Sequence, residues 1–131
     1  MLLLDTNIIY RWLMALPIPG PVAKRIRSEG AMVSILSPWE MLIKHQVGKL
    51  DLPTLDVASD VVAQGFGLLA VKPEHLLALA ELPMLHRDPF DRLLHRDPFD
   101  RLLLAQAKAE GMTVVTTDRI FGEYLPNVLV V

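Results

Sequence analysis

The sequence contains no cysteine, which excludes a disulfide framework, a thiolate nucleophile and a zinc site built on cysteine. Its formal net charge is only −2, so it lacks the strong positive charge of a protein that coats nucleic acid. No uncharged apolar run approaches the ~20 residues that cross a bilayer. The start of the chain, Met1-Leu-Leu-Leu-Asp5, has no basic segment typical of a signal peptide. We therefore expect a cytoplasmic protein with no membrane association.

The pattern of apolar residues predicts one α/β domain. With 131 residues, of which 52% are hydrophobic, the chain is long enough for one packed core and too short for two ordinary domains. Short, near-continuous apolar runs alternate with helical patterns, which favours a parallel sheet covered by helices on both faces. The expected strands are Leu2–Leu4, Met32–Leu36, Gly67–Val71, Thr113–Thr116 and Val128–Val131. The expected helices are Ile8–Leu16, Val22–Glu29, Pro38–Val47 with Ser37 as its cap, Thr54–Ala63, Pro73–Glu81 and Pro98–Glu110.

A nine-residue segment is duplicated in tandem. The segment LHRDPFDRL at 85–93 is repeated letter for letter at 94–102. A proline inside a helix costs ~3 kcal/mol, whereas at the first helical position it costs little, and Asp97 before Pro98 is a good N-cap. We therefore expect a helix to begin at Pro98 and a short extra helical turn or bulged loop at 89–94.

The duplication leaves two candidates for one functional aspartate. In a continuous helix, nine residues make two and a half turns, so Asp91 and Asp100 would face opposite sides. Asp100 keeps the natural spacing to the strand that starts at Thr113, which favours Asp100. The alternative retains Asp91 in the site and bulges out the second copy.

Four acidic residues are expected at one edge of the predicted sheet. Asp5 and Asp118 follow strands, while Glu40 and Asp100 lie in the first turns of helices. The carboxyl ends of parallel strands share one edge, where ligands bind in open α/β sheets. Repulsion among these carboxylates would be relieved by Mg²⁺ or Mn²⁺, which prefer oxygen ligands. Taken singly, Asp5 and Asp118 are equally well explained as helix caps and Glu40 as a solvated first-turn charge.

Four stretches of the chain carry a family resemblance. LLLDTNIIYRWL, SPWEMLIKHQVGKL, HRDPFDRLLLAQAKAEG and TVVTTDRIFGEY resemble, in the same order, the motifs of PIN-domain ribonucleases, specifically the VapC-like toxins of toxin–antitoxin pairs. The similarity runs from Leu2 to Val131. The family pattern holds one HRDPFDR where this chain holds two.

The resemblance implies a fold, an activity and partners. It implies a three-layer α/β/α domain with a central parallel sheet, and a Mg²⁺- or Mn²⁺-dependent endoribonuclease that leaves a 5′-phosphate and a 3′-hydroxyl. It further implies a homodimer and a neutralising antitoxin that covers the helices 8–16 and 22–29 or inserts an arginine into the acidic site. The residues carried over are the metal-binding and catalytic quartet Asp5, Glu40, Asp100 (alternatively Asp91) and Asp118, with Asn7 and Thr117 as supporting polar groups.

Other polar and aromatic residues carry weaker signals. The four histidines form no i, i+4 pair and no H-E-x-x-H motif, so zinc is not expected; His86 and His95 are expected to order the loop before the DPFD helix. Lys44, Lys49 and Arg101 are candidate RNA contacts, although solvated faces or pairing with a local aspartate explain them equally well. Trp12 and Trp39 could stack bases, but core packing or a partner interface explains each better.

Two other functions fit parts of the pattern. A phosphotransfer domain also places aspartates at sheet edges, but it needs a second acid beside the one after the first strand, and Asp5-Thr6-Asn7 has none. Alternatively, the duplication could leave a catalytically impaired PIN-like binding or regulatory subunit. The absence of a P-loop, a G-x-G-x-x-G and a G-x-S-x-G motif argues against nucleotide hydrolysis, dinucleotide chemistry and serine hydrolase chemistry.

Overall fold

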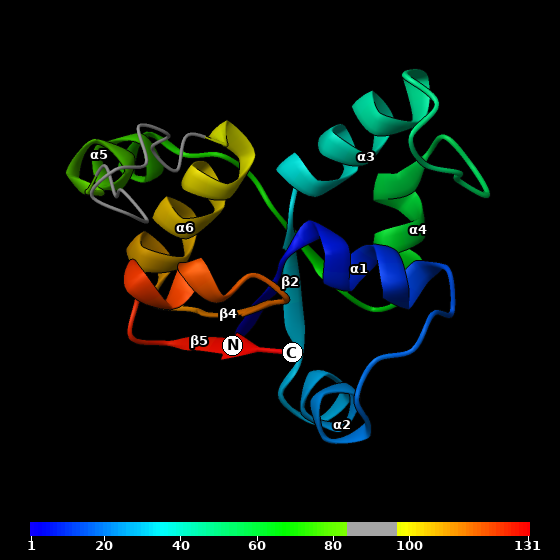
Figure 1. Cartoon of the computed structure of the whole chain (residues 1–131), viewed down its shortest axis with the longest axis horizontal. Helices are drawn as coiled ribbons and strands as arrows, with labels where there is room; N and C mark the ends of the chain where they lie inside the picture. The colour runs from blue at the N-terminus through cyan, green and yellow to red at the C-terminus, as the bar shows by residue number, and fades with distance from the viewer. Residues whose placement is uncertain (84–96) are drawn as a thin grey trace, which may run out of the picture.

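The computed structural model describes residues 1–83 and 97–131 and shows a three-layer α/β/α arrangement around a parallel sheet (Figure 1). The sheet has five strands in the order β3-β2-β1-β4-β5. Its strands are β1 (Leu2–Leu4), β2 (Ala31–Ser34), β3 (Gly67–Leu69), β4 (Thr113–Thr116) and β5 (Val128–Val130). All neighbouring strands pair in parallel, with Leu3 of β1 opposite Met32 of β2 and Val114 of β4. The predicted fold class is confirmed.

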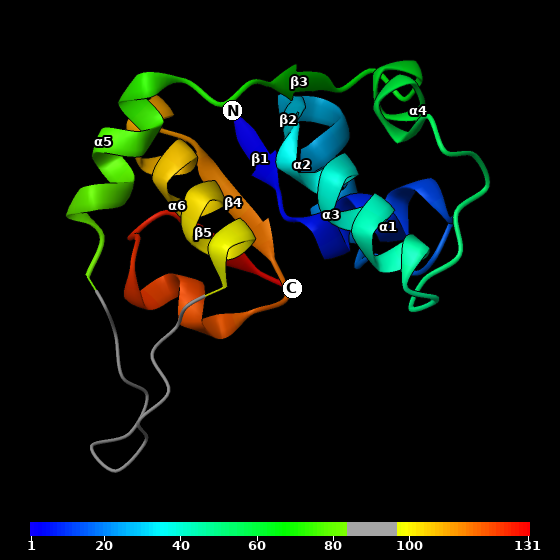
Figure 2. The same cartoon turned by 90° about the horizontal axis from the view of Figure 1, so that it is seen from above.

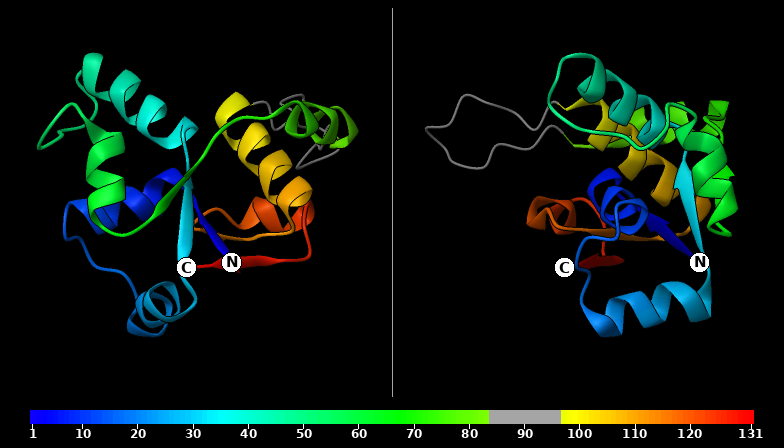
Figure 3. Two further views of the ribbon diagram at one scale, coloured as in Figure 1. Left: turned by 180° about the vertical axis from the view of Figure 1, so that it is seen from behind. Right: turned by 90° about the vertical axis from the view of Figure 1, so that its right-hand side faces the viewer.

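The helices divide between the two faces of the sheet, as the view from above in Figure 2 shows. The helices are α1 (Thr6–Leu13), α2 (Gly20–Glu29), α3 (Leu36–Gln46), α4 (Val57–Ala63), α5 (Pro73–Glu81) and α6 (Pro98–Glu110), with a short 3₁₀ helix η1 (Arg119–Glu123). Helices α1 to α4 lie on one side, and α5, α6 and η1 lie on the other, an arrangement also visible from behind in Figure 3. None of the helices in the part of the chain that the structure describes could cross a membrane.

Alternation along β1 gives the molecule two apolar cores. Leu2 and Leu4 pack with Ile8, Ile9, Val33 and Met41 beneath α1 to α4, whereas Leu3 packs with Leu103, Leu104, Val114 and Phe121 beneath α6 and η1. Successive strand residues point to opposite faces, so a fully buried strand must be apolar throughout. β1 meets this requirement with three buried leucines.

Several predicted boundaries need correction near the carboxyl edge. The second strand ends at Ser34 rather than Leu36, and α3 begins at Leu36 rather than at Pro38. Ser37 does not cap α3, because its buried hydroxyl is hydrogen-bonded to that of Thr6 at 2.9 Å. The predicted helices at 8–16 and 54–63 instead span Thr6–Leu13 and Val57–Ala63, because Asp5 and Asp56 cap them.

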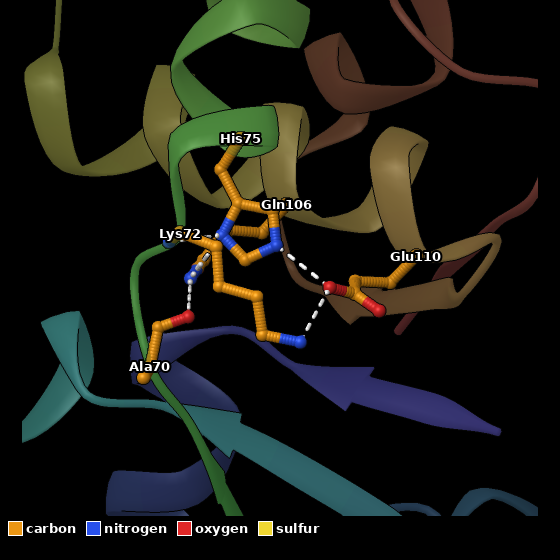
Figure 4. Close-up of polar contacts among 5 residues, drawn as sticks. All are labelled: Ala70, Lys72, His75, Gln106 and Glu110. Carbon is orange, nitrogen blue, oxygen red and sulfur yellow. Dashed lines mark hydrogen bonds and ion pairs between the residues drawn. The ribbon is translucent and has the colours of Figure 1, made fainter.

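The start of α5 is joined to the end of α6 by a buried histidine (Figure 4). His75 is fully buried; its Nδ1 accepts the backbone N–H of Lys72 at 3.0 Å, and its Nε2 lies 2.8 Å from Glu110 Oε1. Because a backbone N–H only donates, the ring proton resides on Nε2 and is donated to Glu110. Lys72 Nζ adds an ion pair with the same oxygen at 3.3 Å. These bonds lower the pKa of Glu110, with the hydrogen bond from His75 as the largest cause.

Candidate metal and nucleic-acid site

A cavity of about 490 Å³ opens at the carboxyl edge of β1 and β4. The first turns of α1, α3 and α6 lie around this edge (Figure 1). The four predicted acidic residues all line this acidic cavity, together with Asn7 and Thr117. Its complete lining consists of Asp5, Thr6, Asn7, Tyr10, Glu40, Met41, Lys44, Lys49, Leu50, Asp97, Asp100, Thr117 and Asp118. The structure therefore brings together residues that lie up to 113 positions apart in the sequence, from Asp5 to Asp118.

Asp5 is held in place by a hydrogen bond to each of its carboxylate oxygens. It caps α1, and its Oδ1 accepts the N–H of Thr6 at 2.7 Å. Its Oδ2 accepts the hydroxyl proton of Thr116, a fully buried residue at the end of β4, also at 2.7 Å. Burial of Asp5 raises the pKa of its carboxyl, and these two hydrogen bonds oppose that rise. The carboxylate is thus oriented before any ligand arrives.

The same threonine also anchors Asp118. The Thr116 hydroxyl accepts the backbone N–H of Asp118 at 3.0 Å, so one side chain links two of the acidic residues. Asp118 caps η1 by accepting the N–H of Ile120 at 3.1 Å. The helix-cap interpretation of Asp5 and Asp118 and their position in the cavity are therefore compatible.

Asn7 and Thr117 connect α1 to the segment after β4. Asn7 Nδ2 donates to Thr117 Oγ1 at 2.9 Å, and both side chains line the acidic cavity. An amide and a hydroxyl contribute neutral oxygen atoms beside the carboxylates. Their positions match the supporting place that the sequence predicted for them, and their role remains a prediction.

Glu40 faces the acidic cavity from the first turn and a half of α3 and pairs with a lysine on the same helix. Lys44 Nζ lies 2.8 Å from Glu40 Oε2, the i, i+4 spacing that brings side chains together on a helix. The Glu40 carboxylate raises the pKa of the Lys44 amine. Lys44 and Lys49 both line the cavity, so each brings a positive charge to an otherwise acidic wall.

Asp100 is the most perturbed of the acidic residues. It lies in the first turn of α6, where Asp97 caps the helix by accepting the N–H of Asp100 at 3.0 Å. Burial raises the pKa of Asp100 to about 8, with further contributions from the negative charges of Asp97, Asp5, Glu40 and Asp118. The site therefore favours a neutralised Asp100, either by a proton or by a nearby cation.

The chemistry of these residues fits a hard divalent cation. Carboxylate, amide and hydroxyl oxygens are the ligands that Mg²⁺ and Mn²⁺ prefer, and a cation would offset the repulsion that raises the pKa of Asp100. As the side chains stand, no three acidic or histidine residues within 1–83 and 97–131 form a group arranged to hold a metal ion.

The remaining sequence predictions concern Arg101 and residues of the duplicated segment. Arg101 is 9% exposed and donates to the carbonyl oxygens of Pro83 and Leu82; its expected contact with RNA remains a prediction. Asp91, His86, His95 and the expected extra turn at 89–94 lie outside the described residues.

The sequence alone did not indicate three residues that shape the acidic cavity. Asp97 was expected only to cap a helix, yet it also lines the cavity. Tyr10 lines the cavity from α1 and donates its hydroxyl proton to the carbonyl of Asp51 at 3.1 Å. Thr116 carried one available signal, a polar side chain at the end of an apolar strand and two positions before Asp118.

Comparison with known proteins identifies the family. The family model described as the PIN domain matches residues 2–124, so the chain belongs to the PIN-domain family. No curated protein sequence matches the chain.

Solved structures share the fold over nearly the whole chain. A DNA-bound VapBC complex from Salmonella typhimurium has a TM-score of 0.61 at 15% identity and covers 99% of this chain and 96% of its own. FitAcB from Neisseria gonorrhoeae gives 0.65 at 21% identity, with coverage of 98% and 96%. VapBC2 from Rickettsia felis, bound to a promoter DNA fragment, gives 0.67 at 15% identity, with coverage of 99% and 96%. At these identities the likeness concerns the fold.

Proposed function

We propose that this protein is a Mg²⁺- or Mn²⁺-dependent endoribonuclease and the toxin of a toxin–antitoxin pair. The observation that carries the proposal is the arrangement of Asp5, Glu40, Asp100 and Asp118 around one cavity at the carboxyl edge of the sheet. Membership of the PIN-domain family supports nuclease chemistry. Similarity in fold to VapBC and FitAcB supports the toxin assignment. The whole chain, 1–131, would act as one nuclease domain.

The four carboxylates would hold the cation, with Asn7 and Thr117 as supporting groups. When bound, a divalent cation lowers the pKa of a water ligand and polarises a phosphodiester oxygen. Thr116 and the N–H of Thr6 keep Asp5 oriented, which reduces the reorganisation needed for binding. Lys44 and Lys49, which line the cavity, would bind phosphates of the RNA. No nucleophilic side chain is required.

The proposed partners are a second copy of the chain, an antitoxin and RNA in the cytoplasm. The region predicted to meet the antitoxin contains an open groove of about 220 Å³ between α1 and α2, lined by Trp12, Leu16, Ile18 and Arg27 among others. The carboxylates of the acidic cavity would bind an arginine side chain of the antitoxin by bidentate pairing.

The test is cleavage of a 5′-labelled single-stranded RNA by purified protein with Mn²⁺, with Mg²⁺ and with EDTA. We expect cleavage with a metal, none with EDTA, and products that carry a 5′-phosphate. Asp5→Asn should abolish cleavage and leave the folded structure intact. Asp51→Asn is the matched control, because Asp51 is exposed and does not line the cavity.

Two results would overturn the proposal. Full activity of Asp5→Asn would remove the metal assignment. Absence of cleavage by a folded wild-type protein, over a panel of transfer, ribosomal and messenger RNA, would favour the impaired regulatory subunit. Trapping of an aspartyl phosphate would instead identify a phosphotransfer domain.

A further inference from the structure

The most exposed aromatic side chain near the acidic cavity belongs to Trp39. The chain has two tryptophans, and they differ in their surroundings. Trp12 is half-buried: its Nε1 donates to Gln64 at 3.1 Å, and its ring meets Phe66 and the guanidinium of Arg27. Trp39 is 57% exposed. Of the two sequence-based interpretations, core packing accounts for Trp12 but not for Trp39, for which a partner interface or base stacking remains.

Two features link Trp39 to the proposed catalytic carboxylates: its position on α3 and its ring contact with α6. Its ring meets that of Phe99 edge to face, with centroids 5.1 Å apart and an interplanar angle of 71°. Trp39 immediately precedes Glu40 on α3, and Phe99 immediately precedes Asp100 on α6. Each ring of the pair is therefore one residue from a carboxylate that lines the acidic cavity. The contact packs the indole of Trp39 against α6, while 57% of the residue remains exposed.

Trp39 also lines an apolar groove of about 240 Å³ between α3 and the start of α4. Its lining consists of Ile35, Pro38, Trp39, Leu42, Leu55, Asp56, Val57 and Ala58. Asp56 is the one charged residue in that lining, and its two carboxylate oxygens already accept from the N–H and hydroxyl of Ser59. The groove is thus a mostly apolar slot with a flat aromatic wall and room for one heterocyclic ring.

The charge distribution distinguishes between possible occupants of this slot. The neighbouring cavity presents carboxylates for a divalent cation and two lysines, Lys44 and Lys49, for phosphates. A ligand that contacts both the cavity and the exposed indole of Trp39 must therefore carry both phosphates and uncharged flat rings. A nucleotide chain has this composition, and aromatic side chains are common stacking platforms for unpaired bases.

We propose that Trp39 is a stacking platform for one base of single-stranded RNA, next to the phosphate that occupies the acidic cavity. This inference rests on the proposed nuclease function and adds a subsite to it. Phe99 acts as a positioning residue that holds the indole at the border of the cavity. Because stacking reads the face of a base rather than its edge, the subsite requires an unpaired base and tolerates any of the four.

The proposal is tested by RNA binding without cleavage. In an Asp5→Asn background with EDTA, the affinity for a fluorescein-labelled single-stranded octaribonucleotide is measured by anisotropy. We expect Trp39→Leu to weaken binding about tenfold and Trp39→Phe to retain most of the affinity. Ile43→Ala is the matched control, an exposed apolar residue on α3 that lines neither the cavity nor the slot; it should leave the affinity unchanged.

Two further measurements separate stacking from a structural role. Oligonucleotides with an abasic site at each position in turn should reveal one position at which Trp39→Leu no longer weakens binding. In a Trp12→Phe variant, Trp39 is the sole tryptophan, so RNA should quench its fluorescence; the Trp39→Phe variant, which retains Trp12, should show little quenching.

The outcomes distinguish this proposal from the proposed function. Equal RNA affinity for Trp39→Leu and wild type, or no RNA binding by either, overturns the stacking platform. A change of both Trp39→Leu and Ile43→Ala from dimer to monomer by light scattering, with RNA affinity unchanged, assigns this face of α3 to a protein interface and also overturns it. If RNA binding depends on Trp39 but the wild type shows no metal-dependent cleavage, the stacking proposal stands and the proposed nuclease function is refuted.

Discussion

The two ends of α6 place a carboxylate in opposite electrostatic environments. Near the start, Asp100 is half-buried among the other carboxylates of the acidic cavity, which raises its pKa to about 8. Near the end, Glu110 accepts from His75 and Lys72, which lowers its pKa (Figure 4). The two residues are ten positions apart, which is ~15 Å along a helix, so one rigid element carries both.

This contrast indicates two different roles. The contacts of Glu110 stabilise the fold, whereas the carboxylates around Asp100 form a candidate ligand site. The environment of Glu110 is complete within the protein, since hydrogen bonds and an ion pair match its charge. The environment of Asp100 combines burial with the negative charges of four other residues, which a proton or a cation would offset. Strongly perturbed pKa values are enriched at functional sites, and here the raised pKa of Asp100 occurs in a cavity lined by carboxylates. The following predictions test whether the two ends of α6 differ in this way.

The largest effect is expected on catalysis at the start of α6. Asp100→Asn should reduce Mn²⁺-dependent RNA cleavage about a thousandfold, because a ligand to the metal contributes several kcal/mol to transition-state stabilisation. The measurement is the initial cleavage rate of labelled RNA. Asp91→Asn, in the other copy of the duplicated segment, serves as the comparison. Activity lost in Asp91→Asn and retained in Asp100→Asn would reverse the assignment, and loss in neither would show that the copies substitute for each other.

The next effect concerns stability at the end of α6. His75→Ala should lower the free energy of unfolding by about 3 kcal/mol, since it removes a fully buried ring and leaves the Lys72 N–H without its acceptor. Urea titration would measure the loss. Cleavage at 25 °C should remain near that of the wild type. His45→Ala, which removes a half-buried histidine with one hydrogen bond to Leu50, should cost less. A larger loss of activity than of stability in His75→Ala would contradict a purely structural role.

A smaller effect is expected from the threonine that links two of the carboxylates. Thr116→Val preserves the shape of the side chain but removes the hydrogen bonds to Asp5 and Asp118. We expect Mn²⁺ affinity, measured by calorimetry, to fall about 10- to 100-fold, the usual cost of losing a group that orients a metal ligand. Thr116→Ser should restore it. Unchanged affinity in the valine variant would show that Asp5 needs no such support.

The smallest effect is a difference in pH dependence between the two ends of α6. The pKa of Asp100 is raised in the folded state, so its stabilising contribution is present below pH ~4 and is lost as pH rises towards 8. In EDTA, Asp100→Asn should therefore be as stable as the wild type near pH 4 and about 1 kcal/mol more stable at pH 8.5, after allowance for solvent screening.

The Glu110→Gln variant should show the opposite pH dependence of stability. The pKa of Glu110 is lowered on folding, so its contribution is present above its ordinary value of 4.5 and is lost as pH falls. Melting temperatures from pH 4 to 8.5 should show Glu110→Gln destabilised at the upper end, where Asp100→Asn is stabilised. Shifts of the same sign in both variants would contradict the electrostatic contrast along α6.

Local sequence signals determined most of the elements and placed four acidic residues at one edge of the sheet. Near-continuous apolar runs such as Leu2–Leu4 allow little besides buried parallel strands, and Asp97-Pro98 with Gly111 defines both ends of α6. The four acidic residues were placed at one edge because every parallel strand ends at the same edge. These inferences depend only on hydrophobic periodicity, helix caps and strand direction. Each of these can be recognised in a short stretch of consecutive residues.

Tertiary structure alone decided how those groups act on one another. The sequence gives no distance between Thr116 and Asp5, which are 111 positions apart, yet their hydrogen bond orients the carboxylate. It could not assign Arg101 to the carbonyls of Pro83 and Leu82, or Trp39 to the ring of Phe99, because each contact joins separate elements. The pKa of Asp100 likewise depends on burial and on charges from four other positions. Burial and through-space electrostatics are properties of packed elements, so the residue types of the site follow from the sequence and their chemical state follows from the fold.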